Sequence, residues 1–132
     1  MKVLIDTTFL LPALGLDVGG EVTDIIKRFE RHDIYFTELS LLEAMWVIRR
    51  IERRGERVDF KLVSTGLKSI LSTYKLVKIP RTAYVKAVRD KRHNDLIDLI
   101  LYYTALVYRM KFLTLDTKLR EIDDKGTLIH SL

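Results

Sequence analysis

Short apolar segments alternate with longer amphipathic segments along the whole chain, and this alternation restricts the fold more than any other feature. The apolar segments predict β-strands at residues 2–5, 34–36, 74–79, 111–116 and 127–130. The amphipathic segments predict helices at residues 19–33, 37–54, 59–73, 82–92, 94–110 and 118–123, with a short helix near Thr8 that Pro12 and Gly15 interrupt. Alternating strands and helices are typical of a parallel sheet with helices on both faces. We therefore expect an α/β fold: a three-layer α/β/α sandwich with a mostly parallel central sheet.

The length of the chain suits one domain, and we expect residues 1–132 to form it. No apolar run is long enough to cross a bilayer, and the N-terminus does not have the pattern of a signal peptide. Cysteine is absent, which excludes thiolate metal sites and cysteine nucleophiles and fits a reducing compartment. We expect a cytoplasmic protein without a membrane partner.

Four acidic residues occupy positions where the local pattern favours apolar or neutral side chains. Asp6 and Asp116 each follow an apolar strand, and the carboxyl ends of parallel strands form the functional edge of such a sheet. Glu43 and Asp98 lie within apolar stretches of predicted helices, where desolvation of a carboxylate is unfavourable and no cap compensates for it. Taken singly, Asp6 and Asp116 could each simply cap the helix that follows.

Taken together, the four carboxylates predict a metal site. Carboxylates held close together repel one another, and a divalent cation such as Mg²⁺ or Mn²⁺ neutralises them. The three histidines (His32, His93 and His130) show no metal-ligand spacing, so a zinc site is not expected. Asp95, three residues before Asp98, is either a fifth ligand or a helix cap. The chemistry that such a site supports is phosphodiester hydrolysis.

In order along the chain, the segments "LIDTTFLL", "TELSLLEA", "DLIDLILYYTAL" and "FLTLD" resemble the PIN-domain nucleases, and in size the chain is most like the VapC-type toxins. The resemblance matches the family's four acids to Asp6, Glu43, Asp98 and Asp116. It places hydroxyl residues at Thr8 and Thr114, where they would orient a carboxylate or a bound water. The resemblance implies a metal-dependent single-strand ribonuclease that acts as a homodimer and is inhibited by a cognate antitoxin.

The excess of positive charge is moderate, at +5, and its distribution is more informative than its size. Arginines are dense at residues 49–57, and a second basic group covers residues 86–92. Both groups could be ordinary solvated surface or could follow an RNA backbone. The residues expected to bind RNA are Arg49, Arg50, Arg53, Arg54, Arg89 and Arg92. Trp46, Met45 and the Tyr102–Tyr103 pair are expected in the core or at a subunit interface.

The leading hypothesis is therefore a Mg²⁺- or Mn²⁺-dependent endoribonuclease in which Asp6, Glu43, Asp98 and Asp116 are the catalytic metal ligands. The alternative is a PIN-fold module that binds RNA or a protein without cutting RNA. A DNA nuclease or a phosphatase on a similar sheet ranks below both, because the chain has little room for additional elements.

Overall fold

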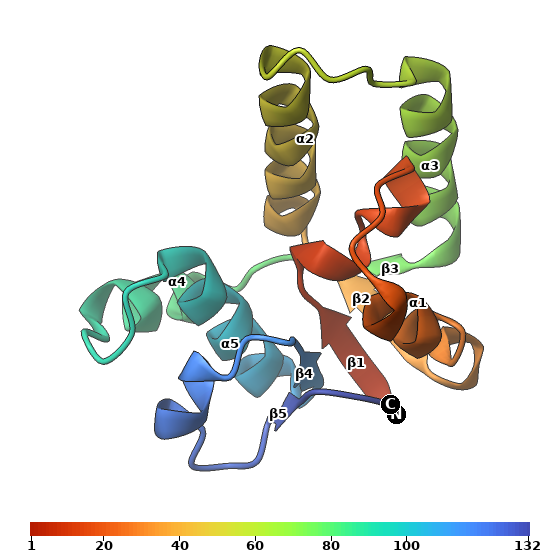
Figure 1. Ribbon diagram of the computed structural model, residues 1–132. Coiled ribbons are helices and arrows are strands. Elements are labelled where there is room, and N and C mark those ends of the chain that lie inside the picture. The colour runs from red at the N-terminus through yellow and green to blue at the C-terminus, as the bar shows by residue number, and fades with distance from the viewer.

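Every strand pairing in the central sheet is parallel, as predicted. The computed structural model describes all 132 residues, and the strand order is β3-β2-β1-β4-β5 (Figure 1). The strands are β1 (Lys2–Ile5), β2 (Asp33–Phe36), β3 (Lys75–Leu76), β4 (Lys111–Leu113) and β5 (Leu128–Ile129). The register places Leu4 beside Tyr35 on one side and beside Phe112 on the other. The N-terminal strand is thus the centre of the sheet.

Five α-helices and four short 3₁₀ helices surround the sheet. The α-helices are α1 (Gly20–Ile26), α2 (Glu38–Arg53), α3 (Phe60–Thr73), α4 (Arg81–Arg89) and α5 (Leu96–Tyr108). The 3₁₀ helices are η1 (Thr7–Phe9), η2 (Pro12–Leu14), η3 (Phe29–Arg31) and η4 (Lys118–Ile122). None of the helices combines the length and the apolar character needed to span a membrane.

Side chains alternate across the sheet and divide the core into two clusters. Val3 and Ile5 of β1 pack with α1, α2 and α3, whereas Leu4, between them, packs with α4 and α5 on the opposite face. All three β1 side chains are fully buried. The sheet therefore lies between two helical layers, and the predicted three-layer sandwich is confirmed (Figure 1).

Several elements end earlier than predicted. The strand predicted at residues 74–79 is only Lys75–Leu76, and the helix predicted at residues 19–33 ends at Ile26, with a separate 3₁₀ turn at Phe29–Arg31. The helix predicted at residues 82–92 ends at Arg89. The strand predicted at residues 111–116 ends at Leu113, so Asp116 lies in the loop beyond it. Two of these changes shorten strands and two shorten helices.

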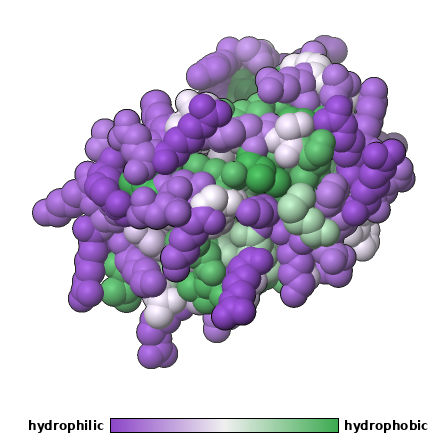
Figure 2. Space-filling model, turned by 90° about the horizontal axis from the view of Figure 1, so that it is seen from below, coloured by the Kyte–Doolittle hydropathy of each residue, from purple (hydrophilic) through white to green (hydrophobic).

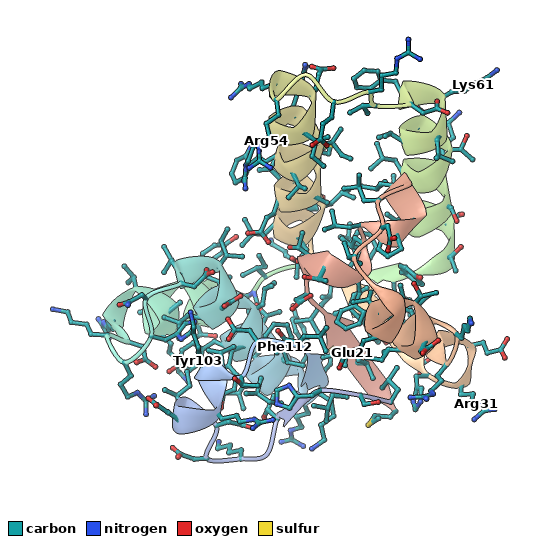
Figure 3. All side chains as sticks on the ribbon, in the orientation of Figure 1. Glu21, Arg31, Arg54, Lys61, Tyr103 and Phe112 are labelled. Carbon is teal, nitrogen blue, oxygen red and sulfur yellow. The ribbon has the colours of Figure 1, made fainter.

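Gly66 lets α3 approach η2 closely. A Cβ atom at this position would overlap the carbonyl oxygen of Ala13. Residues of η2, α2 and α3 belong to one hydrophobic cluster, and side chains of α2 and α3 point into the space between these helices (Figure 3). From below, hydrophilic side chains cover most of the surface, with apolar ones showing between them (Figure 2).

Candidate functional site

The carboxyl ends of β1 and β4 lie side by side at the point where the strand order reverses. From β1 the chain goes to β2 and β3 on one side, and it then returns to β4 and β5 on the other. In open parallel sheets a ligand binds at this reversal, outside the carboxyl ends of the strands. The Asp6 amide donates a 3.2 Å hydrogen bond to the Leu113 carbonyl, which fixes the start of the Asp6 loop against β4.

Asp6 caps the turn that follows it and is also an electrostatically costly carboxylate. Its carboxylate accepts a hydrogen bond from the Thr8 amide at 3.0 Å and so caps η1. Burial raises the pKa of Asp6 to about 6, and the negative charges of Glu43 and Asp116 add to this effect. Hydrogen bonds from the Thr114 hydroxyl and the Thr8 amide oppose the rise without cancelling it. The cap therefore does not remove the electrostatic cost of this carboxylate.

Glu43 reaches the same region from α2. Thr37 caps that helix, its hydroxyl accepting from the Ser40 amide at 3.2 Å, and Glu43 lies half-buried in the second turn. The Thr7 hydroxyl donates a hydrogen bond to Glu43. Thr8 was expected to orient a carboxylate or a bound water, but its contact with the cluster is the amide bond to Asp6. The neighbouring Thr7 supplies the hydroxyl that bonds to Glu43.

Asp98 lies in the first turn of α5 and contacts a histidine. Asp95 caps this helix by accepting from the Asp98 amide at 3.2 Å. His93 Nε2 lies 3.3 Å from Asp98 Oδ2, and the two side chains are 7% and 17% exposed. Burial, the charge of Asp95 and contact with Asp116 raise the pKa of Asp98 to about 7, although the hydrogen bond from His93 acts in the opposite direction.

Asp116 joins these residues into one cluster. Its charge acts on both Asp6 and Asp98, and the potential ligand atoms of His93, Asp98 and Asp116 all lie within 4.8 Å of one another. Thr114 accepts a hydrogen bond from the Asp116 amide at 3.1 Å, so this predicted threonine does position the loop. The four predicted acids therefore converge from β1, α2, α5 and the loop after β4.

Asp95 has one of the two roles expected for it, and His93 was not predicted at all. Asp95 is exposed and caps α5, and it does not belong to the group of close ligand atoms. His93 belongs to that group but was not predicted, because its contact depends on how a loop folds and not on local spacing. Beside the cluster is a hollow of about 320 Å³ without hydrophobic lining residues, which Asp116, Asp95, His93 and Lys118 help to form.

The donor set fits a hard divalent cation. Carboxylate oxygens, with water completing the shell, are the ligands that Mg²⁺ and Mn²⁺ prefer, and imidazole nitrogen also suits transition metals. Burial first, and neighbouring negative charge second, raise the pKa values of Asp6 and Asp98, so the ionised carboxylates are costly without a counter-charge. A cation bound among Asp6, Glu43, Asp98 and Asp116 would relieve this repulsion.

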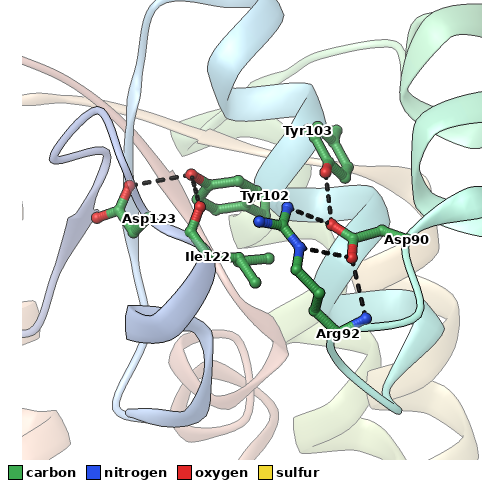
Figure 4. Close-up of polar contacts among 6 residues, drawn as sticks. All are labelled: Asp90, Arg92, Tyr102, Tyr103, Ile122 and Asp123. Atoms are coloured by element: carbon green, nitrogen blue, oxygen red, sulfur yellow. Dashed lines mark hydrogen bonds and ion pairs between the residues drawn. The ribbon is translucent and has the colours of Figure 1, made fainter.

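A buried aspartate fixes the loop that carries His93 (Figure 4). The Asp90 side chain is 5% exposed and accepts bonds of 3.0 and 2.8 Å from Arg92 and of 2.6 Å from the Tyr103 hydroxyl. These bonds, led by that from Arg92, hold the pKa of Asp90 well below its usual range.

Tyr102, also in Figure 4, is buried and bonds to Asp123 at 3.0 Å. Tyr102 is therefore a core residue, one of the two roles expected for it.

Replacing Asp90 by Ala is expected to lower the free energy of unfolding by about 2 kcal/mol, because the Tyr103 hydroxyl and the Arg92 guanidinium lose their partner. Because the folded-state pKa is lowered, the contribution is present above pH 4 and is lost as the pH falls further. Urea unfolding at pH 7 measures it, with the exposed Asp124→Ala as the matched control. Equal stability of the two variants would contradict this role of Asp90.

The predicted RNA-binding arginines lie outside the acidic cluster. Arg49, Arg50, Arg53 and Arg54 are exposed near the end of α2, and Arg89 is exposed at the end of α4. Arg92 is half exposed, but its guanidinium is already paired with Asp90. Trp46 and Met45 are 50% and 37% exposed, so the core, one of the two places expected for them, is wrong, and a subunit interface stays a prediction.

Comparisons with known proteins agree with this fold. The family model described as the PIN domain matches residues 3–125. The crystal structure of PAE2754 from Pyrobaculum aerophilum is 25% identical with a TM-score of 0.67, over 97% of this chain and 83% of that one. A toxin–antitoxin complex from Klebsiella pneumoniae contains a chain that is 16% identical with a TM-score of 0.63, over 96% of this chain and 95% of that one. The comparison with curated proteins gives no match. Because the family model spans nearly the whole sequence, the chain belongs to the PIN domain family.

Proposed function

We propose that this protein is a Mg²⁺- or Mn²⁺-dependent endoribonuclease in which Asp6, Glu43, Asp98 and Asp116 hold the metal. The observation that carries the proposal is the convergence of these four acids, from distant parts of the chain, at the reversal point of the sheet. Membership of the PIN family supports nuclease chemistry. The basic groups on α2 and α4 support a polyanionic substrate, and RNA is the substrate that we propose.

The chemistry that a divalent cation supplies at such a site is activation of water and neutralisation of charge on the phosphodiester. The residues of the chain prepare the site for it. Thr7 holds the Glu43 carboxylate, Thr114 holds the loop of Asp116, and the Asp90–Arg92 pair fixes the loop of His93 beside Asp98. Each acid is thus held in place by a neighbour from another part of the chain or from its own loop.

The proposal extends to partners. We propose a cytoplasmic protein in which residues 1–132 act as one domain, working as a homodimer with a cognate antitoxin. The toxin–antitoxin complex from Klebsiella pneumoniae, which has the same fold, supports this choice of partner. Light scattering of the purified protein tests the dimer. Co-purification with the product of a neighbouring small gene tests the antitoxin.

The central test is cleavage of single-stranded RNA. Wild-type protein is expected to cut in Mn²⁺ or Mg²⁺, to stop in EDTA, and to resume when excess Mn²⁺ is added. Asp98→Asn, purified in the same way, controls for contaminating nuclease. Calorimetric titration with Mn²⁺ separates the enzyme from a module that only binds RNA. An absence of cleavage with either ion, or equal cleavage by Asp98→Asn, would overturn the proposal.

A further inference from the structure

Trp46 is an exposed aromatic residue surrounded by arginines. It is the only tryptophan of the chain, and half of its surface is accessible to solvent. With Arg49, Arg50 and Arg53 it lines a hollow of about 480 Å³ on α2. The four residues stand at i, i+3, i+4 and i+7, so one face of the helix presents them together. An exposed indole next to three guanidinium groups has the composition of a nucleic-acid contact surface.

The arginines of this hollow have little internal neutralisation. Arg50 and Arg53 take part in none of the molecule's ion pairs. Arg49 lies 3.2 Å from Glu52, but both side chains are solvent-exposed, and such pairs are weak. Arg54 and Arg57 add further positive charge at the same end of the helix. The hollow therefore favours an anionic occupant.

The hollow is aligned with the acidic cluster. Glu43 precedes Trp46 by three residues and Arg50 by seven, so all three lie on the same side of α2. At 1.5 Å per residue, Arg53 lies about 15 Å along the helix axis from Glu43, roughly the length of four stacked nucleotides. In Figure 1, α2 projects away from the sheet at the end where these acids gather. A single strand of RNA bound along this face of α2 would lead directly to Glu43.

On this basis, which rests on the proposed function, we infer that Trp46, Arg49, Arg50 and Arg53 form a binding subsite for single-stranded RNA. Trp46 stacks on an unpaired base, and the arginines contact the phosphates on either side of it. A second copy of the chain fits this surface less well. In a two-fold interface centred on Trp46, the arginines of one copy would face those of the other.

The test uses the intrinsic fluorescence of Trp46, which no other tryptophan obscures. Wild-type protein in EDTA, where RNA is not cut, is titrated with a ten-nucleotide single-stranded RNA of adenosines and with the corresponding duplex. The single strand is expected to quench the fluorescence saturably, whereas the duplex, whose bases are already paired, leaves it nearly unchanged. Binding of the single strand without quenching would overturn the inference, as would a fluorescence shift that follows protein concentration alone and so reveals self-association.

Variants assign the contacts, with affinity measured by anisotropy of labelled RNA. Trp46→Ala is expected to weaken binding about tenfold or more, and Trp46→Phe, which keeps a stacking ring, no more than about threefold. Arg50→Gln should also reduce the slope of log K against log salt by about 0.7. Arg31→Gln, which removes an exposed arginine far from α2 (Figure 3), should behave like wild type. Equal binding by Trp46→Ala and wild type, or equal losses in Arg50→Gln and Arg31→Gln, would contradict the subsite.

The binding and cleavage measurements test the subsite and the nuclease proposal separately. If metal-dependent cleavage is observed but quenching is not, the subsite is wrong and the nuclease proposal stands. If quenching and its variant pattern are observed without cleavage under any metal, the subsite stands and the nuclease proposal is wrong.

Discussion

Replacing Asp116 by Asn is expected to lower RNA cleavage by at least about 10³-fold and also to make the metal-free protein more stable. The loss of cleavage follows because Asp116 is the acid that links Asp6 with Asp98. The gain in stability follows because the substitution removes a negative charge that raises both of their pKa values. We expect the free energy of unfolding in EDTA at pH 7 to rise by about 1 kcal/mol.

Asparagine keeps the oxygen that accepts a 2.9 Å hydrogen bond from the Lys118 amide, so the loop should retain its conformation. The measurements are urea unfolding in EDTA and cleavage of single-stranded RNA in Mn²⁺. Asp124→Asn, an exposed acid-to-amide change, should leave both unchanged. A variant that is both inactive and less stable than wild type would contradict the electrostatic origin of the effect and indicate a structural role for Asp116.

The metal-free protein is expected to lose stability as the pH rises from 4 to 7. Burial and neighbouring charge raise the pKa of Asp6 to about 6 and of Asp98 to about 7, from 3.8 in the unfolded chain. Between pH 4 and 7 the folded protein therefore holds protons that the unfolded chain has released, and its free energy of unfolding falls. Each pKa unit corresponds to about 1.4 kcal/mol, and solvent screening reduces the expected total to the order of 2 kcal/mol.

Mn²⁺ should reverse this trend. The ion binds ionised carboxylates, so it should raise the melting temperature at pH 7.5 and have little effect at pH 4.5. Lys75 and Arg92 lower the pKa values of Asp33 and Asp90, respectively. These two groups therefore change the free energy of unfolding only below pH 4, and not between pH 4 and 7. Thermal unfolding at several pH values, with Mn²⁺ or with EDTA, provides the measurement, and Asp98→Asn should flatten the metal-free curve. Equal stabilisation by Mn²⁺ at both pH values would place the ion elsewhere.

The fold could be predicted because its determinants are local. The strand predicted at Lys2–Ile5 and the helix cap predicted at Thr37 are both confirmed. The strand predicted at residues 74–79 shortened because pairing with β2 stops at Leu76, after which only the Val77 amide bonds to Phe36. The length of a strand at the edge of a sheet depends on how far its partner strand pairs with it, and the sequence alone does not give that pairing.

The site could be predicted only in part. The acids were recognisable because a carboxylate among apolar neighbours is costly, whatever the tertiary structure. His93 was not, because it reaches Asp98 through a loop that Asp90 and Arg92 hold in place. The core position, one of the two alternatives for Trp46, was wrong: the i+4 series of Ser40, Ala44 and Ile48 marks the buried face of α2, and Trp46 lies outside it. That face could have been identified from the spacing alone.

The central position of β1 also determines when the acidic cluster can be completed during synthesis. The ribosome makes β1 first, but its neighbour β4 and then Asp116 follow only after more than a hundred further residues. At 5–20 residues per second this interval is roughly 5 to 20 s. A nascent chain or an early-terminated fragment therefore has Asp6 and Glu43 but lacks the acid that joins them to Asp98. Under the proposed function, a nascent chain cannot cut RNA until Asp116 has been made.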